Sequence, residues 1–277
     1  MNRRTFIVAL LGTPAVAAFV VACGDDAKQS SNESVSAALD EVVLRIGYRG
    51  GYVAPGTDFV SLPTLLVTGD GRVFTPGVTA AVFPGPLLAP LLERSITREG
   101  IDALIAHAAG FGLLAAAPDY ALVAEPMVAD ASDTVVELTV DGNRYEHRAY
   151  ALGFEVDDAN PSSPARDNLQ RFVDSVADLA SVVGAENLGM HRPFAPDRYR
   201  FQAMVVDPTE WADPSPTVAA WPADTGVELA SATDCASLAA GVGDGLFLKA
   251  TQLTFFREDD LVYRLAVAGV LPGDTAC

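Results

Sequence analysis

Positive charge is scarce in this chain of 277 residues, and its only lysines are Lys28 and Lys249. Against 18 Lys and Arg stand 36 Asp and Glu, which gives a formal net charge of −18. Proteins that bind nucleic acid through its phosphates need clustered basic residues, so this balance excludes nucleic acid as a partner. The same charge opposes adsorption to anionic lipid headgroups, so electrostatic attraction would not hold the protein at a membrane.

Cysteine and histidine are also rare, with three of each. Metal sites of the zinc type need several Cys or His ligands, and none of these residues lies close to another in sequence, so no metal site is expected. The G-x-S-x-G and H-E-x-x-H motifs and the phosphate-binding glycine loop are missing as well. The sequence therefore predicts no cofactor and offers no recognised catalytic motif.

One long uncharged run is present, and it lies at the N-terminus. It extends from Thr5 to Ala22, follows Arg3 and Arg4, and ends at Cys23. A positive start, an apolar core and small residues before a cleavage point are typical of an export signal. Val20-Val21-Ala22-Cys23 resembles a bacterial lipobox, which implies lipidation of Cys23 and cleavage just before it. Because buried acyl chains contribute about 0.8 kcal/mol per CH₂, this predicts lipid anchoring on the extracytoplasmic face of the cell membrane.

Two features of this N-terminus remain open. The uncharged run is just long enough to span a bilayer as an uncleaved anchor, although Gly12, Thr13 and Pro14 weaken that alternative. Asn2 to Ile7 also resembles a twin-arginine export motif, which implies export of the folded protein. In the alternative, Arg3 and Arg4 only supply the positive start of a general export signal.

Four segments are expected along the chain. They are a signal peptide over residues 1–22, a Ser-rich flexible tether over 23–40, an N-terminal α+β unit over 41–153, and a C-terminal α+β unit over 154–277 that begins with a long helix. The two units could also pack as one domain. Half of the residues are hydrophobic, so the 255 residues after the signal can form a substantial core.

Hydrophobic periodicity predicts the main elements. Alternation favours strands over 42–48 and 199–206 and a hairpin around Asp141-Gly142. A helix over 98–109 with Thr97 as its N-cap and a longer helix over 165–183 have the 3.6-residue period. Several hairpins, two principal helices and no βαβ alternation predict an α+β fold with mainly antiparallel sheets.

The end of the chain is expected to form a closing hairpin. Its strands would cover 246–256 and 261–270, with a polar turn between them. The glycines Gly241, Gly243 and Gly245 are interpreted as a loop before the first of these strands rather than as a phosphate-binding motif.

Cys235 and Cys277 remain once Cys23 is lipidated. Outside the cytoplasm, an even pair of cysteines indicates a disulfide. The bridge would close a loop of about 42 residues, for which the chain-entropy estimate is roughly 4 kcal/mol, and would hold the C-terminus on the domain. Two free thiols or a metal-binding pair are the alternatives.

Three aromatic residues form the candidate binding surface. Trp211, Trp221 and Tyr199 lie around a proline-rich loop, where exposed aromatics can bind sugars or peptides. The alternative is that they pack as a small cluster under the loop.

The histidines and acidic groups are weaker candidates. His107 is expected at the edge of a helix core, His147 as a cross-strand ion partner between Glu146 and Arg148, and His191 in a loop. Asp157, Asp158 and Asp167 carry oxygen ligands that suit calcium, but Pro161 and Pro164 break any EF-hand spacing, so solvated loop acids are expected.

Six short stretches carry a resemblance to a known group of proteins. They are Gly50-Gly51, Thr68-Gly69-Asp70-Gly71-Arg72-Val73, Phe83-Pro84-Gly85-Pro86, Asp130-Ala131-Ser132-Asp133-Thr134-Val135-Val136, Tyr150-Ala151-Leu152-Gly153 and Trp221-Pro222. With them, most of residues 42–277 resembles cell-envelope lipoproteins of actinobacteria. The resemblance implies a place in the cell envelope but no particular activity.

These observations favour a non-enzymatic binding or envelope-associated role at the membrane, with a protein or small-molecule partner. An extracytoplasmic hydrolase with an acidic site is one alternative. A small-molecule-binding component of an uptake system is another, although two matched α/β lobes are not visible in the sequence.

Overall fold

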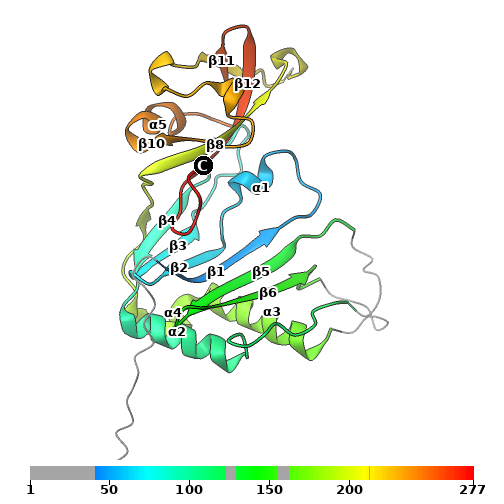
Figure 1. The fold of residues 1–277 in the computed structure, drawn as a ribbon, viewed down its shortest axis with the longest axis vertical. Helices are drawn as coiled ribbons and strands as arrows, with labels where there is room; N and C mark the ends of the chain where they lie inside the picture. Colours follow the sequence, from blue (N-terminus) through cyan, green and yellow to red (C-terminus); the bar gives the residue numbers. More distant parts are fainter. Residues whose placement is uncertain (1–40, 123–128, 155–161, 212) are drawn as a thin grey trace, which may run out of the picture. The chain divides into compact units, whose positions relative to one another are not determined.

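The computed structural model describes residues 41–122, 129–154, 162–211 and 213–277 (Figure 1). The expected signal peptide and tether lie outside these ranges, and with them Arg3, Arg4 and Cys23, so the lipid anchor stays a prediction. Asp157 and Asp158 lie outside as well. Among the described residues, no helix is both long and apolar enough to cross a membrane.

The first sheet has seven strands in the order β6-β5-β1-β2-β3-β4-β7, and every neighbouring pair is antiparallel. Its strands are β1 (Val42–Arg49), β2 (Leu65–Thr68), β3 (Arg72–Pro76), β4 (Leu91–Ser95), β5 (Asp133–Val140), β6 (Asn143–Tyr150) and β7 (Arg192–Pro193). The predicted hairpin at Asp141-Gly142 is confirmed, since it joins β5 to β6.

The second sheet has five strands in the order β10-β8-β12-β11-β9. Its strands are β8 (Arg198–Val205), β9 (Thr217–Ala220), β10 (Ala236–Ala239), β11 (Thr254–Glu258) and β12 (Leu261–Gly269). The pair β9–β11 is parallel and the other pairs are antiparallel. The predicted combination of helices with mainly antiparallel sheets is therefore confirmed.

Five α-helices are present in the described ranges: α1 (Thr57–Val60), α2 (Arg98–Gly110), α3 (Pro164–Ala177), α4 (Leu179–Val183) and α5 (Ala240–Phe247). The expectation of two principal helices is therefore not confirmed. The long helix predicted over 165–183 is divided, because Asp178 leaves the helical conformation (φ −104°, ψ 75°) between α3 and α4. Thr97 caps α2 as predicted, since its side chain accepts a hydrogen bond from the backbone N–H of Gly100.

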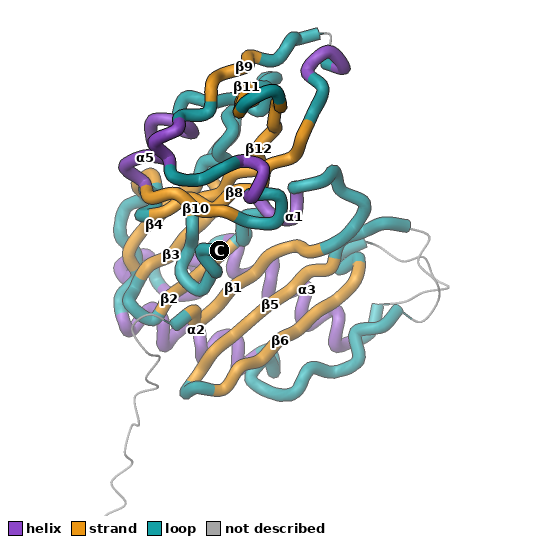
Figure 2. Tube along the Cα trace, turned by 45° about the horizontal axis from the view of Figure 1, so that its top comes forward, coloured by secondary structure: helices purple, strands orange, loops and turns teal. Residues whose placement is uncertain are grey.

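Helices α2, α3 and α4 cover one face of the first sheet (Figures 1 and 2). Leu44 and Ile46 of β1 are buried in one hydrophobic cluster with Leu104 of α2 and Phe172 of α3. Helices from beyond residue 163 thus share a core with strands from before residue 153. The expected division into two units at residue 154 stays a prediction.

The region before β11 differs from the prediction. Residues 246–256 were expected to form one strand, but α5 includes Leu246 and Phe247, and β11 begins only at Thr254. Gly241, Gly243 and Gly245 lie in α5 rather than in a loop. The helix can pack closely on Tyr199 because Gly243 has no side chain. A Cβ at this position would overlap the buried ring of Tyr199.

The C-terminal segment, residues 271–277, returns across the first sheet on the face opposite the helices. Leu271 is buried there in a cluster with Leu66 of β2 and Phe74 of β3. Cys277 and Cys235 are at disulfide distance, with their Cα atoms 5.6 Å apart, in agreement with the predicted pair.

Candidate functional site

The face of β1 and β5 that points away from the helices is charged. Arg45, Gly47 and Arg49 lie on this face because alternate residues of a strand point the same way, whereas Leu44 and Ile46 point to the helices. In the pairing of the two strands, Arg45 lies directly opposite Glu137 of β5. The alternation in the sequence of β1 therefore places two guanidinium groups on one side of the sheet.

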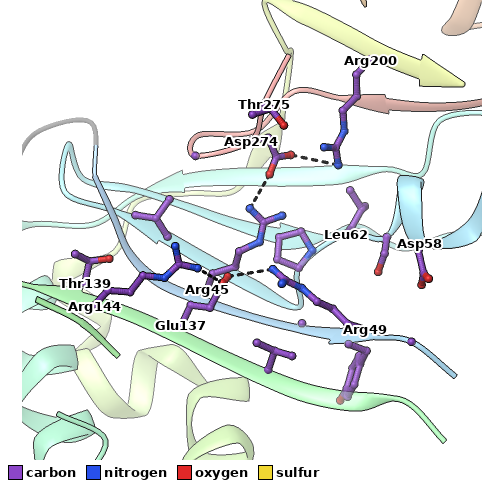
Figure 3. A pocket seen from close by; sticks show the side chains of 18 residues that line it. Arg45, Arg49, Asp58, Leu62, Glu137, Thr139, Arg144, Arg200, Asp274 and Thr275 are labelled. Atoms are coloured by element: carbon purple, nitrogen blue, oxygen red, sulfur yellow. Dashed lines mark hydrogen bonds and ion pairs between the residues drawn. The ribbon is translucent and has the colours of Figure 1, made fainter. Parts of the chain in front are cut away.

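A cavity of about 600 Å³ lies over this charged face (Figure 3). The strands β1 and β5 supply its floor, and residues 58–63 after β1 supply one wall. Arg144 reaches it from β6, Arg200 reaches it from β8 of the second sheet, and Gly273, Asp274 and Thr275 of the C-terminal segment supply another wall. Segments far apart in the sequence thus meet in one cavity.

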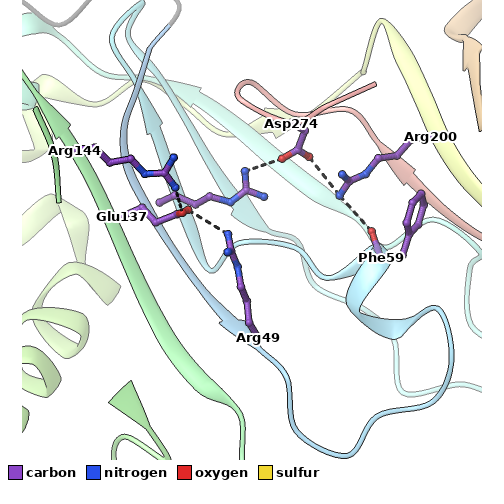
Figure 4. A network of polar contacts seen from close by, with 7 residues as sticks. Arg49, Phe59, Glu137, Arg144, Arg200 and Asp274 are labelled. Carbon is purple, nitrogen blue, oxygen red and sulfur yellow. Dashed lines mark hydrogen bonds and ion pairs between the residues drawn. The ribbon is translucent and has the colours of Figure 1, made fainter. Parts of the chain in front are cut away.

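Four arginines share two carboxylates in this cavity (Figure 4). Asp274 accepts from Nη1 of Arg45 at 2.7 Å and forms an ion pair with Nη2 of Arg200 at 3.5 Å, and we call these two arginines the inner pair. Glu137 accepts from Nη2 of Arg144 at 2.6 Å and of Arg49 at 3.3 Å, and these are the outer pair. Asp274 balances one of the two inner arginines, so one positive charge is in excess there, whereas the outer pair has a second carboxylate nearby, since Oε2 of Glu146 lies 4.0 Å from Nη2 of Arg144.

The two pairs differ in exposure. The side chains of Arg45 and Arg200 are 19% and 18% exposed, and that of Asp274 is 6% exposed. The side chains of Arg49 and Arg144 are 53% and 64% exposed. Because charges interact more strongly where water is excluded, the inner pair should attract an anion more strongly than the outer pair.

The guanidinium groups of the cavity use few of their donors. Each of the four arginines contacts its carboxylate through a single nitrogen, although a guanidinium carries five N–H groups. The Nε of Arg200 is buried and has no hydrogen-bond partner within the described part of the chain. Its Nη2 also donates to the backbone oxygen of Phe59 at 3.2 Å, and its guanidinium lies 5.1 Å from the ring centre of that residue.

Arg148 of β6 shows the contrasting arrangement. It contacts Asp133 of β5 through two nitrogens, Nε at 2.9 Å and Nη2, which both donate to Oδ2. Arg148 does not line the cavity. Arg148 therefore differs from the cavity arginines in lying outside the cavity and in using two nitrogens for one carboxylate.

The predicted aromatic surface is wrong for two of its three residues. Tyr199 is 1% exposed and Trp221 is 7% exposed, and both belong to the core of the second sheet. The indole N–H of Trp221 donates to the backbone oxygen of Val227 at 2.7 Å. Alternation along β8 turns Tyr199 inward together with Phe201, so these side chains support the packing alternative.

Trp211 lies apart from the other two. It packs against Phe255 with ring centres 5.5 Å apart and lines a second cavity of about 260 Å³. The guanidinium of Arg264 lies 5.9 Å from the centre of its ring. The structure thus separates Trp211 from Tyr199 and Trp221, which share one core cluster.

The prediction that His147 is an ion partner is wrong, because this residue is fully buried. Its Nε2 lies 2.9 Å from the backbone oxygen of Leu113, which can only accept, so Nε2 carries a proton. Its Nδ1 lies 2.8 Å from the hydroxyl of Tyr120, whose pKa is raised by burial. His147 therefore ties β6 to the segment after α2.

The other histidines and the acidic group form no common site. Nε2 of His107 lies 2.7 Å from the hydroxyl of Ser175, which joins α2 to α3, and burial lowers the pKa of this histidine. His191 is exposed in the loop before β7, and Asp167 lies in the first turn of α3. Over the described ranges, no three His, Cys, Asp or Glu residues are grouped so that they could hold a metal ion.

The arginine cavity was not predicted from the sequence. One signal was present, since Arg45 and Arg49 interrupt an otherwise apolar strand at spacing four. Arg200 and Asp274 carry no such signal, because only the tertiary structure brings them to β1.

No protein family, curated protein or solved structure matches this chain. Its function is therefore inferred from the chemistry of the cavity.

Proposed function

We propose that this protein is a lipid-anchored, extracytoplasmic binding protein whose arginine cavity takes a small anionic ligand. One observation carries the binding role: four arginines converge on two carboxylates in one cavity, although the whole chain has a net charge of −18. With Asp58 the lining has three carboxylates against four arginines, so a small excess of positive charge is local to the cavity and opposes the sign of the rest of the molecule.

The chemistry of the cavity suits an oxyanion. Guanidinium groups match carboxylate and phosphate geometry because they offer parallel N–H donors, and most of these donors are open in the cavity. The volume of about 600 Å³ lies within the usual range for small-molecule sites. The lining contains arginines, carboxylates and a few hydroxyl groups but none of the histidines, which favours binding over proton-transfer catalysis.

The location rests on other observations. The lipobox at Cys23 supports the lipid anchor, and the disulfide-distance pair Cys235–Cys277 suits an oxidising compartment outside the cytoplasm. Expression of Cys23→Ser in a bacterial host tests the anchor. We expect wild-type protein in the membrane fraction with the mass of added lipid, and the variant in the soluble fraction. A variant that stays in the membrane fraction would contradict lipid anchoring.

Thermal unfolding of the purified full chain tests the binding role, with sodium acetate, succinate and phosphate as probes at constant ionic strength. We expect at least one anion to raise the melting temperature, since a ligand that binds the folded state stabilises it. The double variant Arg49→Gln/Arg144→Gln should reduce the rise that succinate gives. The matched control is Arg148→Gln, on the same sheet face outside the cavity, which should keep it. No rise with any anion, or the same loss in the control, would contradict an anion site in the cavity.

A further inference from the structure

The guanidinium donors of the cavity are divided between two places. At the inner pair, Arg45 and Arg200 share Asp274, and at the outer pair, Arg49 and Arg144 share Glu137. Within the described ranges, no carboxylate is bonded to arginines of both pairs. Each pair is therefore a separate subsite of guanidinium donors, with one positive charge in excess at the inner pair and the further carboxylate of Glu146 4.0 Å from Arg144 at the outer pair.

The two subsites are held by different parts of the fold. Arg200 and Asp274 come from β8 and the C-terminal segment, whereas Glu137 and Arg144 come from the floor of the cavity (Figure 3). On β1, Arg45 and Arg49 lie four residues apart, so their Cα atoms are separated by roughly 13 Å. An anionic group held by the donors of one pair would leave the open donors of the other pair free for a second anionic group.

Apolar groups line the space around the charged ones. Val42, Leu62, Pro63 and Val135 belong to the cavity wall and floor together with the arginines. Apolar surface stabilises a hydrocarbon segment through its removal from water. A ligand with methylene groups between two anionic ends would match both the charged and the apolar parts of this lining.

From this arrangement we infer that the ligand class is an extended dianion, a small molecule with two carboxylate-type groups joined by a short carbon spacer. This inference rests on the proposed function. One anionic end occupies the inner pair and accepts from the open donors of Arg45 and Arg200. The other end occupies the outer pair and accepts from the open donors of the more exposed Arg49 and Arg144.

Calorimetric titration of the full chain at constant ionic strength tests this assignment. The probes are the monocarboxylates acetate and butyrate, the dicarboxylates malonate, succinate, glutarate and adipate, and inorganic phosphate. A second charge-assisted contact should give at least about a tenfold gain, so we expect the best dicarboxylate to bind at least that much more tightly than butyrate and phosphate. Equal affinities for butyrate and the dicarboxylates, or tighter binding of phosphate than of every dicarboxylate, would overturn the extended dianion.

A single variant separates the two subsites. Arg49→Gln removes one outer arginine whose side chain is 53% exposed, so folding should be preserved, and circular dichroism checks it. We expect it to weaken dicarboxylate binding about tenfold and to change butyrate binding less than twofold, while Arg148→Gln changes neither. Equal weakening of butyrate and dicarboxylate by Arg49→Gln would show one subsite and overturn the inference.

The proposed function and this inference fail in different ways. If neither the carboxylates nor phosphate bind, the anion site itself is wrong and the ligand class with it. If monoanions and dianions bind equally and Arg49→Gln weakens both, the cavity binds anions but the two-ended ligand is wrong.

Discussion

The carboxylate of Asp274 accepts a hydrogen bond from Nη1 of Arg45 at 2.7 Å, which joins two residues 229 positions apart. This contact fastens the C-terminal segment to the central strand region of the first sheet. Because Asp274 also pairs with Arg200 of β8, one carboxylate connects both sheets and the end of the chain. The same three side chains form the inner part of the arginine cavity.

Asp274→Asn should therefore lower the stability of the fold. The amide keeps the shape but loses the charge, so two arginines that are about one-fifth exposed lose their counter-ion. Hydrogen bonds to charged groups contribute about 1.5–3 kcal/mol, and we expect a loss of about that size in the free energy of unfolding by urea. Asp260→Asn, in the exposed turn before β12, is the control and should change it by less than about 0.5 kcal/mol. Equal losses in the two variants would contradict the role of Asp274.

Reduction of the Cys235–Cys277 pair should also destabilise the protein. The bridge closes a loop of 42 residues, and the chain-entropy estimate for such a loop is an upper value of roughly 4 kcal/mol. We expect a reductant to lower the melting temperature of the wild type. The double variant Cys235→Ser/Cys277→Ser should melt at the lower temperature with or without reductant. If reductant does not change the melting temperature of the wild type, the bridge does not contribute to stability.

Alkaline pH should destabilise the second sheet through Tyr199. Burial, together with the hydrogen bond from its hydroxyl to Asp244 at 2.6 Å, raises the pKa of Tyr199 well above its ordinary value of 10.0. The folded state thus holds this proton more tightly than the unfolded state does. The resulting stabilisation is complete below about pH 10 and is lost as the pH rises above that value, towards the pKa of the folded state.

Urea unfolding at a series of pH values from 8 to about 11 measures this effect. Tyr199→Phe should have a lower stability at pH 8 but a shallower decline above pH 10. The control is Tyr52→Phe, since Tyr52 is 90% exposed, and it should keep the wild-type decline. The same steep decline in Tyr199→Phe would assign the alkaline loss to other groups.

Substitution by alanine should have opposite effects on stability at two glycines of α5. A Cβ at Gly243 would overlap the buried ring of Tyr199, and a Cβ at Gly245 would meet no atom within 4 Å. Gly243→Ala should cost about 1–3 kcal/mol because the ring must move in a packed core. Gly245→Ala should be neutral or stabilising by up to about 1 kcal/mol, because alanine favours the helix. Chemical denaturation of both variants compares them, and a loss at Gly245 equal to that at Gly243 would contradict close packing of α5 on β8.

Much of the fold could be predicted because its signals are local. The turn Asp141-Gly142 and the N-cap Thr97 each act within a few residues, and both were identified correctly. The strand predicted over 246–256 was wrong because an apolar, glycine-containing stretch suits a strand or a buried helix equally. Packing of Gly243 on Tyr199 selects the helix, and that contact spans 44 positions of the chain.

His147 shows the same limit for a single side chain. Its neighbours Glu146 and Arg148 suggested an ionic role, since adjacent residues were the only partners visible. Alternation along β6 turns both neighbours to the other face of the sheet and buries His147 against Tyr120 and Leu113. The hydrogen-bond partners of a buried residue can lie on segments that are distant in the sequence, and the adjacent residues do not identify them.

By itself, the sequence determined the net charge, the antiparallel character of the sheets, the cysteines available for a disulfide, and the placement of Arg45 and Arg49 on one face of β1. These properties depend on composition, on the two-residue period of a strand and on the number of cysteines. Only the tertiary structure decided that a cavity exists there, because its inner wall is supplied by Arg200 and Asp274. Their attraction to β1 acts through space over a few ångströms, and their distant positions in the chain do not reveal it.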